Sequence, residues 1–138
     1  MRVEARSTRR GRGYPPGRAR RFLPEALALS GHAGEEISVL ICGDRAMRGL
    51  NRRYRGKDRT TDVLSFPAGR PGGFLGDIVI SEPEARRQAR RAGVSLDGVM
   101  RKLLLHGLLH LLGYDHETDG GEMDALEARL RPRLGVRG

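Results

Sequence analysis

Hydrophobic and polar residues follow two different periods along the chain, and each period predicts a different element. Short runs rich in β-branched residues predict strands, and apolar residues that recur every three or four positions predict helices. The predicted strands are 3–8, 36–43, 61–67 and 74–81, and the predicted helices are 18–31, 44–56, 81–93, 95–113 and 121–135. This order predicts an α+β domain in which a small mixed sheet packs with about five helices.

Polar residues, glycine and proline mark the ends of several predicted helices. Ser81 and Ser95 precede helical patterns and are expected to be N-caps. Pro24 is expected to interrupt the first helix or to restart it, and Pro132 to limit the last one. Leucines cover every side of the predicted helix 95–113, so we expect this helix to be central and buried.

Length and composition predict a single domain over residues 1–138. The first 21 residues contain eight arginines and one glutamate, and their Gly and Pro content argues against the amphipathic helix of a transit peptide. No apolar run has the roughly 20 residues that a membrane span requires, and no signal peptide is evident. The single cysteine, Cys42, excludes an internal disulfide and fits a reducing, cytoplasmic compartment.

The net charge is +9, and 24 of the 26 basic residues are arginines. This excess favours a polyanionic partner, with RNA or a ribosomal surface before a membrane, because no basic amphipathic helix stands out. The alternative is that arginine content reflects nucleotide composition and solubility. With six aromatic residues in the chain, we expect charge more than stacking to hold the RNA.

Three of the four histidines lie in the segment HGLLHLLGYDH, residues 106–116. His106 and His110 are four positions apart and therefore project from one face of a helix. Gly113 allows the helix to end, so that His116 can return to a third ligand position. Three neutral imidazoles leave an open position for water on one zinc ion per chain, and such water ionises at a pH of about 7. The alternative of hydrogen-bonded core histidines explains this spacing poorly, because three unpaired imidazoles among leucines would be costly.

The same spacing is that of the metzincin peptidases, H-E-x-x-H-x-x-G-x-x-H. Gly107 stands where those enzymes have their glutamate general base, so the sequence disfavours a peptidase. Glycine in a helix also costs about 1 kcal/mol against alanine, which indicates that position 107 needs room for a neighbouring backbone or a substrate.

HGLLHLLGYDH resembles the metal motif of the YbeY-type endoribonucleases, bacterial factors of rRNA maturation and ribosome quality control. LNRRYRGKDRTTDVLSFP at 50–67 and GDIVIS at 76–81 agree with that family, so the resemblance covers about residues 37–130 in order. Thr60 stands where the family often has proline, and residues 1–21 match poorly. The resemblance implies a zincin-like fold, with the metal motif on the central helix.

The resemblance also implies a zinc-dependent, single-strand-specific endoribonuclease that processes the 3′ end of 16S rRNA. It carries His106, His110 and His116 over as metal ligands, with His106 also as a catalytic residue, and Arg55 as a catalytic or RNA-contacting residue. An arginine suits this chemistry because it stabilises charge on the nonbridging oxygens of a phosphodiester that water attacks.

Other polar residues are candidates for supporting roles. Lys57 is a weaker candidate for phosphate contact, and Ser65 is a candidate to face the cleft. Asp77 or its rival Asp115 is expected to orient a ligand histidine, as zinc-bound histidines usually require. Asp58 and Asp62 are interpreted as caps or turn residues.

The expected partners are single-stranded RNA, an rRNA precursor and the small ribosomal subunit or its proteins, with no DNA and no membrane. Two other functions stay open. One is another zinc hydrolase, a peptidase or amidase; the other is a ribosome-assembly factor whose zinc is structural.

Overall fold

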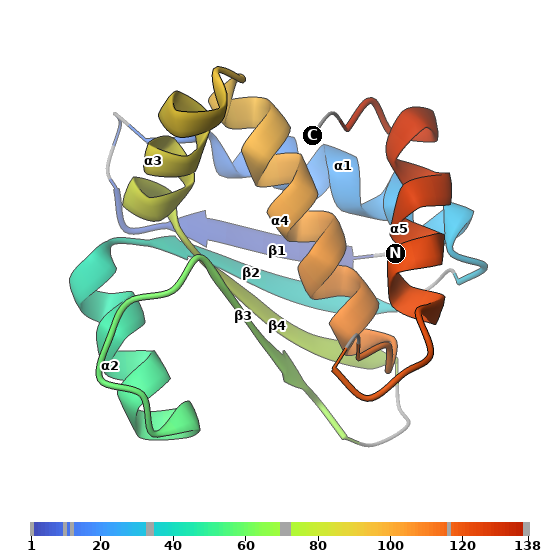
Figure 1. Ribbon diagram of the computed structural model, residues 1–138, viewed down its shortest axis with the longest axis horizontal. Helices are drawn as coiled ribbons and strands as arrows, with labels where there is room; N and C mark the ends of the chain where they lie inside the picture. The colour runs from blue at the N-terminus through green and yellow to red at the C-terminus, as the bar shows by residue number, and fades with distance from the viewer. Residues whose placement is uncertain are drawn as a thin grey trace.

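The computed structural model describes residues 2–9, 11, 13–32, 35–69, 73–115 and 117–136, which form four strands and five helices (Figure 1). The strands are β1 (Arg2–Ser7), β2 (Glu36–Cys42), β3 (Val63–Pro67) and β4 (Phe74–Ser81). The helices are α1 (Pro16–Leu29), α2 (Asp44–Arg55), α3 (Glu82–Ala92), α4 (Leu96–Leu111) and α5 (Glu122–Arg133). The predicted α+β class is therefore confirmed.

The sheet is mixed, with the strand order β1-β2-β4-β3. The first three strands run parallel, and β3 pairs antiparallel with β4. Parallel neighbours need a crossover connection, and helices α1 and α2 lie in the connections that lead from β1 to β2 and from β2 towards β4. Strand β3 lies at an edge of the sheet and pairs with β4.

The two faces of the sheet are covered unequally, because side chains alternate along each strand. On β2, Ile37 and Ile41 belong to the large core that includes residues of α1, α3, α4 and α5. Cys42 points to the other face and packs with Met47 of α2 in a smaller cluster. Figure 1 shows this arrangement, with α2 alone on its side of the sheet.

Helix α4 crosses the middle of the sheet face that carries the large core, as its leucines predict (Figure 1). Its fully or nearly fully buried leucines are Leu103, Leu104, Leu105, Leu108, Leu109 and Leu111. Ser81 and Ser95 accept hydrogen bonds from the backbone N–H of Glu84 and Gly98, so both expected N-caps are confirmed. No helix within the described ranges is long and apolar enough to cross a membrane.

Helix α1 differs from the prediction that Pro24 interrupts or restarts it. It begins at Pro16, two residues before the predicted start, and continues through Pro24 to Leu29. Proline suits the first helical turn, where its missing N–H would lack a partner in any case. Beyond Pro24, Ala26 and Leu27 are fully buried, and their packing compensates for the hydrogen bond that Pro24 cannot donate.

Gly107 lets α4 approach the sheet closely. A β-carbon at this position would lie 2.9 Å from Cγ2 of Ile78, which is fully buried in the middle of β4. The room that the sequence predicted at this position is therefore taken by a core side chain. A glutamate side chain would meet the same obstacle, so the structure gives the peptidase general base no place here.

We expect Gly107→Ala to lower the free energy of unfolding by about 1–2 kcal/mol, because overpacking outweighs the gain in helix propensity. Gly49 in α2 is the matched control, since a β-carbon there has no atom within 4 Å. Gly49→Ala should raise the free energy of unfolding by up to about 1 kcal/mol. Urea unfolding of the three proteins measures both effects. A Gly107→Ala protein as stable as Gly49→Ala would contradict the close packing.

Candidate active site

Two histidines of α4 present their ring nitrogens to the same point. The Nε2 atoms of His106 and His110 lie 3.1 Å apart, and the ring planes meet at 75°. Most residues of α4 are buried, whereas the His106 side chain is 30% exposed. Spacing by four residues thus brings the two imidazoles together, as the sequence predicts.

The chain turns sharply where α4 ends. Gly113 has φ +99°, a left-handed conformation that favours glycine. Its N–H donates to the carbonyl of His110, and the N–H of Tyr114 donates to that of Leu109. This pair of hydrogen bonds is a Schellman motif, so the helix stop expected at Gly113 is confirmed. His116, the expected third ligand, lies outside the described residues.

Glu127 of α5 holds His106 from behind. Its Oε1 accepts a hydrogen bond of 3.0 Å from Nδ1 of His106, and Arg131 donates to Oε2 at 2.8 Å. Burial raises the pKa of Glu127, but the hydrogen bonds from His106 and Arg131 outweigh it and hold the pKa below the usual value of a glutamate. The carboxylate is therefore ionised at neutral pH, and a neutral imidazole that donates to it through Nδ1 presents the lone pair of Nε2 towards His110.

Glu127 was not found by sequence reasoning, which expected Asp77 or Asp115 to orient a histidine. Asp77 lies next to Ile78, which packs against α4, and alternation along β4 turns Asp77 to the opposite face of the sheet. Asp115 lies beside the site but accepts a hydrogen bond from the backbone N–H of Glu117. The only signal for Glu127 was its position in a helix that follows the motif, and only packing brings α5 against α4.

Glu127→Gln is expected to weaken metal binding about 10- to 100-fold, because an amide holds a ligand histidine less firmly than a carboxylate does. Asp124→Asn is the matched control: Asp124 is exposed on the same helix and should have no effect. Competition with a chromogenic chelator measures the affinity. Equal affinities for the two variants would mean that Glu127 serves stability alone.

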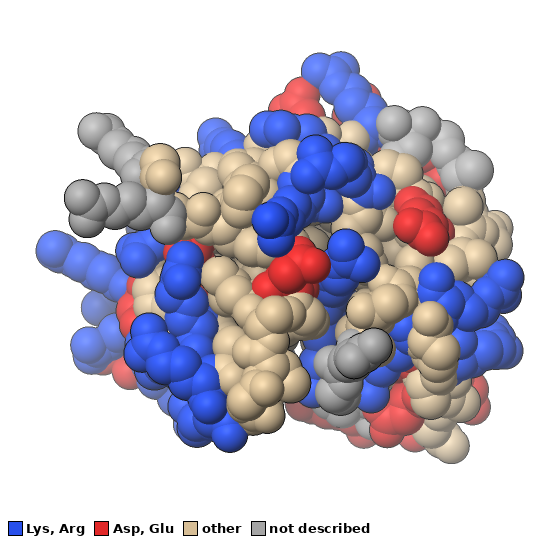
Figure 2. Space-filling model, turned by 90° about the horizontal axis from the view of Figure 1, so that it is seen from above, with Lys and Arg blue, Asp and Glu red and all other residues tan. Residues whose placement is uncertain are grey.

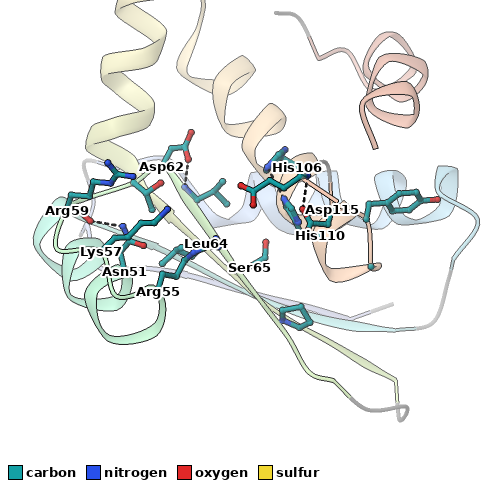
Figure 3. Close-up of a pocket in the computed structure, with 16 residues that line it drawn as sticks. Asn51, Arg55, Lys57, Arg59, Asp62, Leu64, Ser65, His106, His110 and Asp115 are labelled. Carbon is teal, nitrogen blue, oxygen red and sulfur yellow. Dashed lines mark hydrogen bonds between the residues drawn. The ribbon is translucent and has the colours of Figure 1, made fainter. Parts of the chain in front are cut away.

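The histidines line one wall of a pocket of about 480 Å³, called here the histidine pocket. Its lining includes Arg55, Lys57, Arg59, Ser65, His106 and His110, and the neighbours of position 116, Asp115 and Glu117, also border it. Figure 3 shows the basic residues around the end of α2 on one side, the histidines of α4 on the other, and Ser65 of β3 between them.

The basic wall is held in place by the end of α2. Gly56, at φ +68°, adopts the left-handed conformation that ends the helix just after Arg55. Asn51 is buried, and its side-chain Nδ2 donates to the backbone carbonyl of Arg59 at 2.8 Å. The backbone carbonyl of Asn51 accepts a hydrogen bond from the N–H of Lys57. Asn51 is a second supporting residue that the sequence did not indicate. It fixes the loop that carries the cations.

The structure also places the remaining candidates. Ser65 borders the pocket as expected, and its hydroxyl donates to the carbonyl of Gly107 at 3.1 Å. Asp62 accepts from the N–H of Val63, which agrees with a turn residue. Asp58 forms an exposed ion pair with Arg48 at 2.9 Å, away from the histidines.

The histidine pair fits a metal ion by its chemistry and its spacing. Two nitrogens at about 2.0–2.1 Å from a tetrahedral zinc ion lie about 3.3 Å apart, close to the 3.1 Å between the Nε2 atoms. The carboxylate behind His106 is the usual partner of a zinc-bound imidazole. Among the described residues no third His, Cys, Asp or Glu joins this pair in a metal-binding group, and His116 is not among them.

Comparison with known proteins shows which family this chain resembles. The family model described as Endoribonuclease YbeY matches residues 18–135. Two proteins described as endoribonuclease YbeY, from Koribacter versatilis and Solibacter usitatus, are 51% and 52% identical to this chain over 113 and 103 residues. These matches cover 82% and 75% of this chain and 73% and 69% of the two relatives.

The solution structure of TM1509 from Thermotoga maritima has the same fold, with a TM-score of 0.67 at 23% identity over 97% of this chain and 89% of that one. The sequence matches place the chain among the phosphodiester hydrolases, a class that suits histidines facing basic side chains. The chain belongs to the endoribonuclease YbeY family. The predicted family, fold and enzyme class are thus confirmed, and the match begins nearer to the N-terminus than the resemblance over 37–130 indicated.

Proposed function

We propose that this chain is a zinc-dependent endoribonuclease that cleaves single-stranded RNA, with an rRNA precursor at the 16S 3′ end as its substrate and the small ribosomal subunit as its partner. The observation that carries the proposal is the histidine pair opposite Arg55 across one pocket. Family membership supports the RNA substrate and the rRNA role.

The charge of the chain supports a polyanionic substrate. The net charge is +9, and basic side chains outnumber acidic ones on the face shown in Figure 2. Within the histidine pocket, Arg55, Lys57 and Arg59 gather at one wall. A strand of RNA can lay successive phosphates along such a wall, whereas a duplex is a stiff, wide rod that does not enter a pocket of this size.

In this proposal His106, His110 and His116 hold zinc, which would supply Lewis-acid chemistry and water that ionises near neutral pH. Arg55 binds the nonbridging oxygens of the scissile phosphate and stabilises the charge that develops there. Lys57 and Arg59 hold neighbouring phosphates, and Ser65 lies at the floor between the two walls. Glu127 keeps Nε2 of His106 directed into the pocket.

Cleavage assays with the full chain separate this proposal from its rivals. Single-stranded RNA, duplex RNA and a peptide library are incubated with zinc-loaded protein, each with and without chelator. We expect chelator-sensitive cleavage of single-stranded RNA alone. Cleavage of peptides instead of RNA would establish a peptidase, and a folded, zinc-containing protein that cleaves nothing would favour a structural role for the metal in ribosome assembly.

A further inference from the structure

Tyr54 is an exposed aromatic residue beside the candidate catalytic arginine. It lies in the last turn of α2, one position before Arg55, and 60% of its surface is exposed. Within the described part of the chain, the other exposed large hydrophobic residues are Phe74 and Val94, at 39% and 38%. An exposed aromatic ring beside cationic side chains offers a face on which a base of a single-stranded nucleic acid can stack.

The ring of Tyr54 packs against a neighbouring aromatic ring. It meets the ring of Phe66 on β3 edge to face, with centroids 5.2 Å apart and planes at 68°. This geometry is favourable for aromatic pairs, and it uses only part of the Tyr54 surface. A ring that already packs against a neighbour loses less entropy when a ligand stacks on it than a ring without such a contact.

A second hollow of about 390 Å³, called here the tyrosine hollow, joins Tyr54 to the histidine pocket. Its lining residues are Tyr54, Arg55, Lys57, Leu64, Ser65 and Phe66. Four of them, Arg55, Lys57, Leu64 and Ser65, also line the histidine pocket, so the two hollows share a wall. The described lining of the tyrosine hollow contains two cations and no carboxylate, which suits a ligand with both a phosphate and an aromatic ring.

We propose that Tyr54 stacks on one unpaired nucleobase of the RNA strand whose adjacent phosphate is bound by Arg55 and Lys57. This inference rests on the proposed function and deepens it, because it names a contact that selects single strands. A base in a duplex has both faces covered by its neighbours, whereas an unpaired base can offer a face to the tyrosine ring. Every base has such a face, so the site should tolerate any sequence.

The test compares four variants on an RNA oligonucleotide and on a series in which each nucleotide in turn is abasic. Dissociation constants are measured by fluorescence anisotropy with chelator, so that the RNA stays intact, and cleavage rates are measured with zinc. Tyr54→Ala and Tyr54→Leu remove the aromatic face, and leucine keeps apolar contact with Phe66. Tyr54→Phe keeps the face, and Phe74→Ala is the control for loss of an exposed aromatic residue elsewhere.

We expect Tyr54→Ala and Tyr54→Leu to raise Kd about 5- to 100-fold, while Tyr54→Phe and Phe74→Ala bind as the parent chain does. One abasic position should weaken binding to the parent chain by a similar factor and have no further effect in Tyr54→Leu. If Tyr54→Leu, folded as judged by its Tm, binds intact RNA normally or keeps the abasic penalty, the stacking contact does not exist. Tyr54-dependent binding without cleavage would refute the proposed activity alone, and a parent chain that neither binds nor cleaves RNA would refute both.

Discussion

The His110→Ala variant is expected to lose its zinc and, with it, RNA cleavage by a factor of about 10³ or more. Catalytic zinc sites use three protein ligands, and without one of them the ion is neither retained nor able to lower the pKa of its bound water to about 7. His110 is preferable to His106 for this test because removal of His106 would also take a hydrogen bond from the buried Glu127. Elemental analysis and cleavage of single-stranded RNA measure the two losses.

His32→Ala is the matched control, because His32 is the one histidine outside the segment 106–116 and its side chain is 42% exposed. It should retain one zinc ion and full activity. A His110→Ala protein that keeps stoichiometric zinc, or that cleaves RNA at the rate of His32→Ala, would remove the basis of the proposed site. Loss of zinc with unchanged cleavage would separate the metal from the reaction.

Arg55→Ala is expected to lower kcat about 10²- to 10³-fold with a smaller change in KM. A donor directed at charge that develops in the transition state contributes more to that state than to the bound substrate. Arg55→Lys should recover only part of the rate, because an ammonium group lacks the two parallel donors of a guanidinium. Steady-state cleavage of a fluorescent single-stranded RNA separates kcat from KM.

Arg53→Ala controls for the loss of one positive charge from the same helical turn. Arg53 is exposed and does not line the histidine pocket. Its replacement should change KM modestly, and more so at low salt, because it alters only the general attraction of RNA. Equal losses in kcat for Arg53→Ala and Arg55→Ala would mean that Arg55 contributes only to the general positive charge and has no specific role in catalysis.

Much of the fold is local and was therefore predictable. Periodicity gave each strand and helix of the described residues within a few positions, and Gly113 marked the turn after α4. Pro24 misled because the rule for proline describes an isolated helix, whereas the buried face of α1 keeps the helix continuous. Packing energy outweighed a local preference.

The candidate site also has a part that local sequence predicts and a part that depends on packing. Helical spacing alone brings His106 and His110 together, since residues four apart share a face whatever the rest of the chain does. The sequence also determined the charge, the motif and, through it, the family. The sequence does not show how side chains of different elements face one another. Asp77 was therefore expected near the histidines, although it lies on the opposite face of the sheet.

Only the tertiary structure decided which distant residues support the pair. It brought Glu127 of α5 to His106, used buried Asn51 to fix the cationic loop, and placed Ile78 of β4 against Gly107. It also joined Tyr54 to Phe66 beside Arg55. The physical reason is that these contacts join segments far apart in the chain, so they depend on how helices pack on the sheet and leave no periodic trace in the sequence.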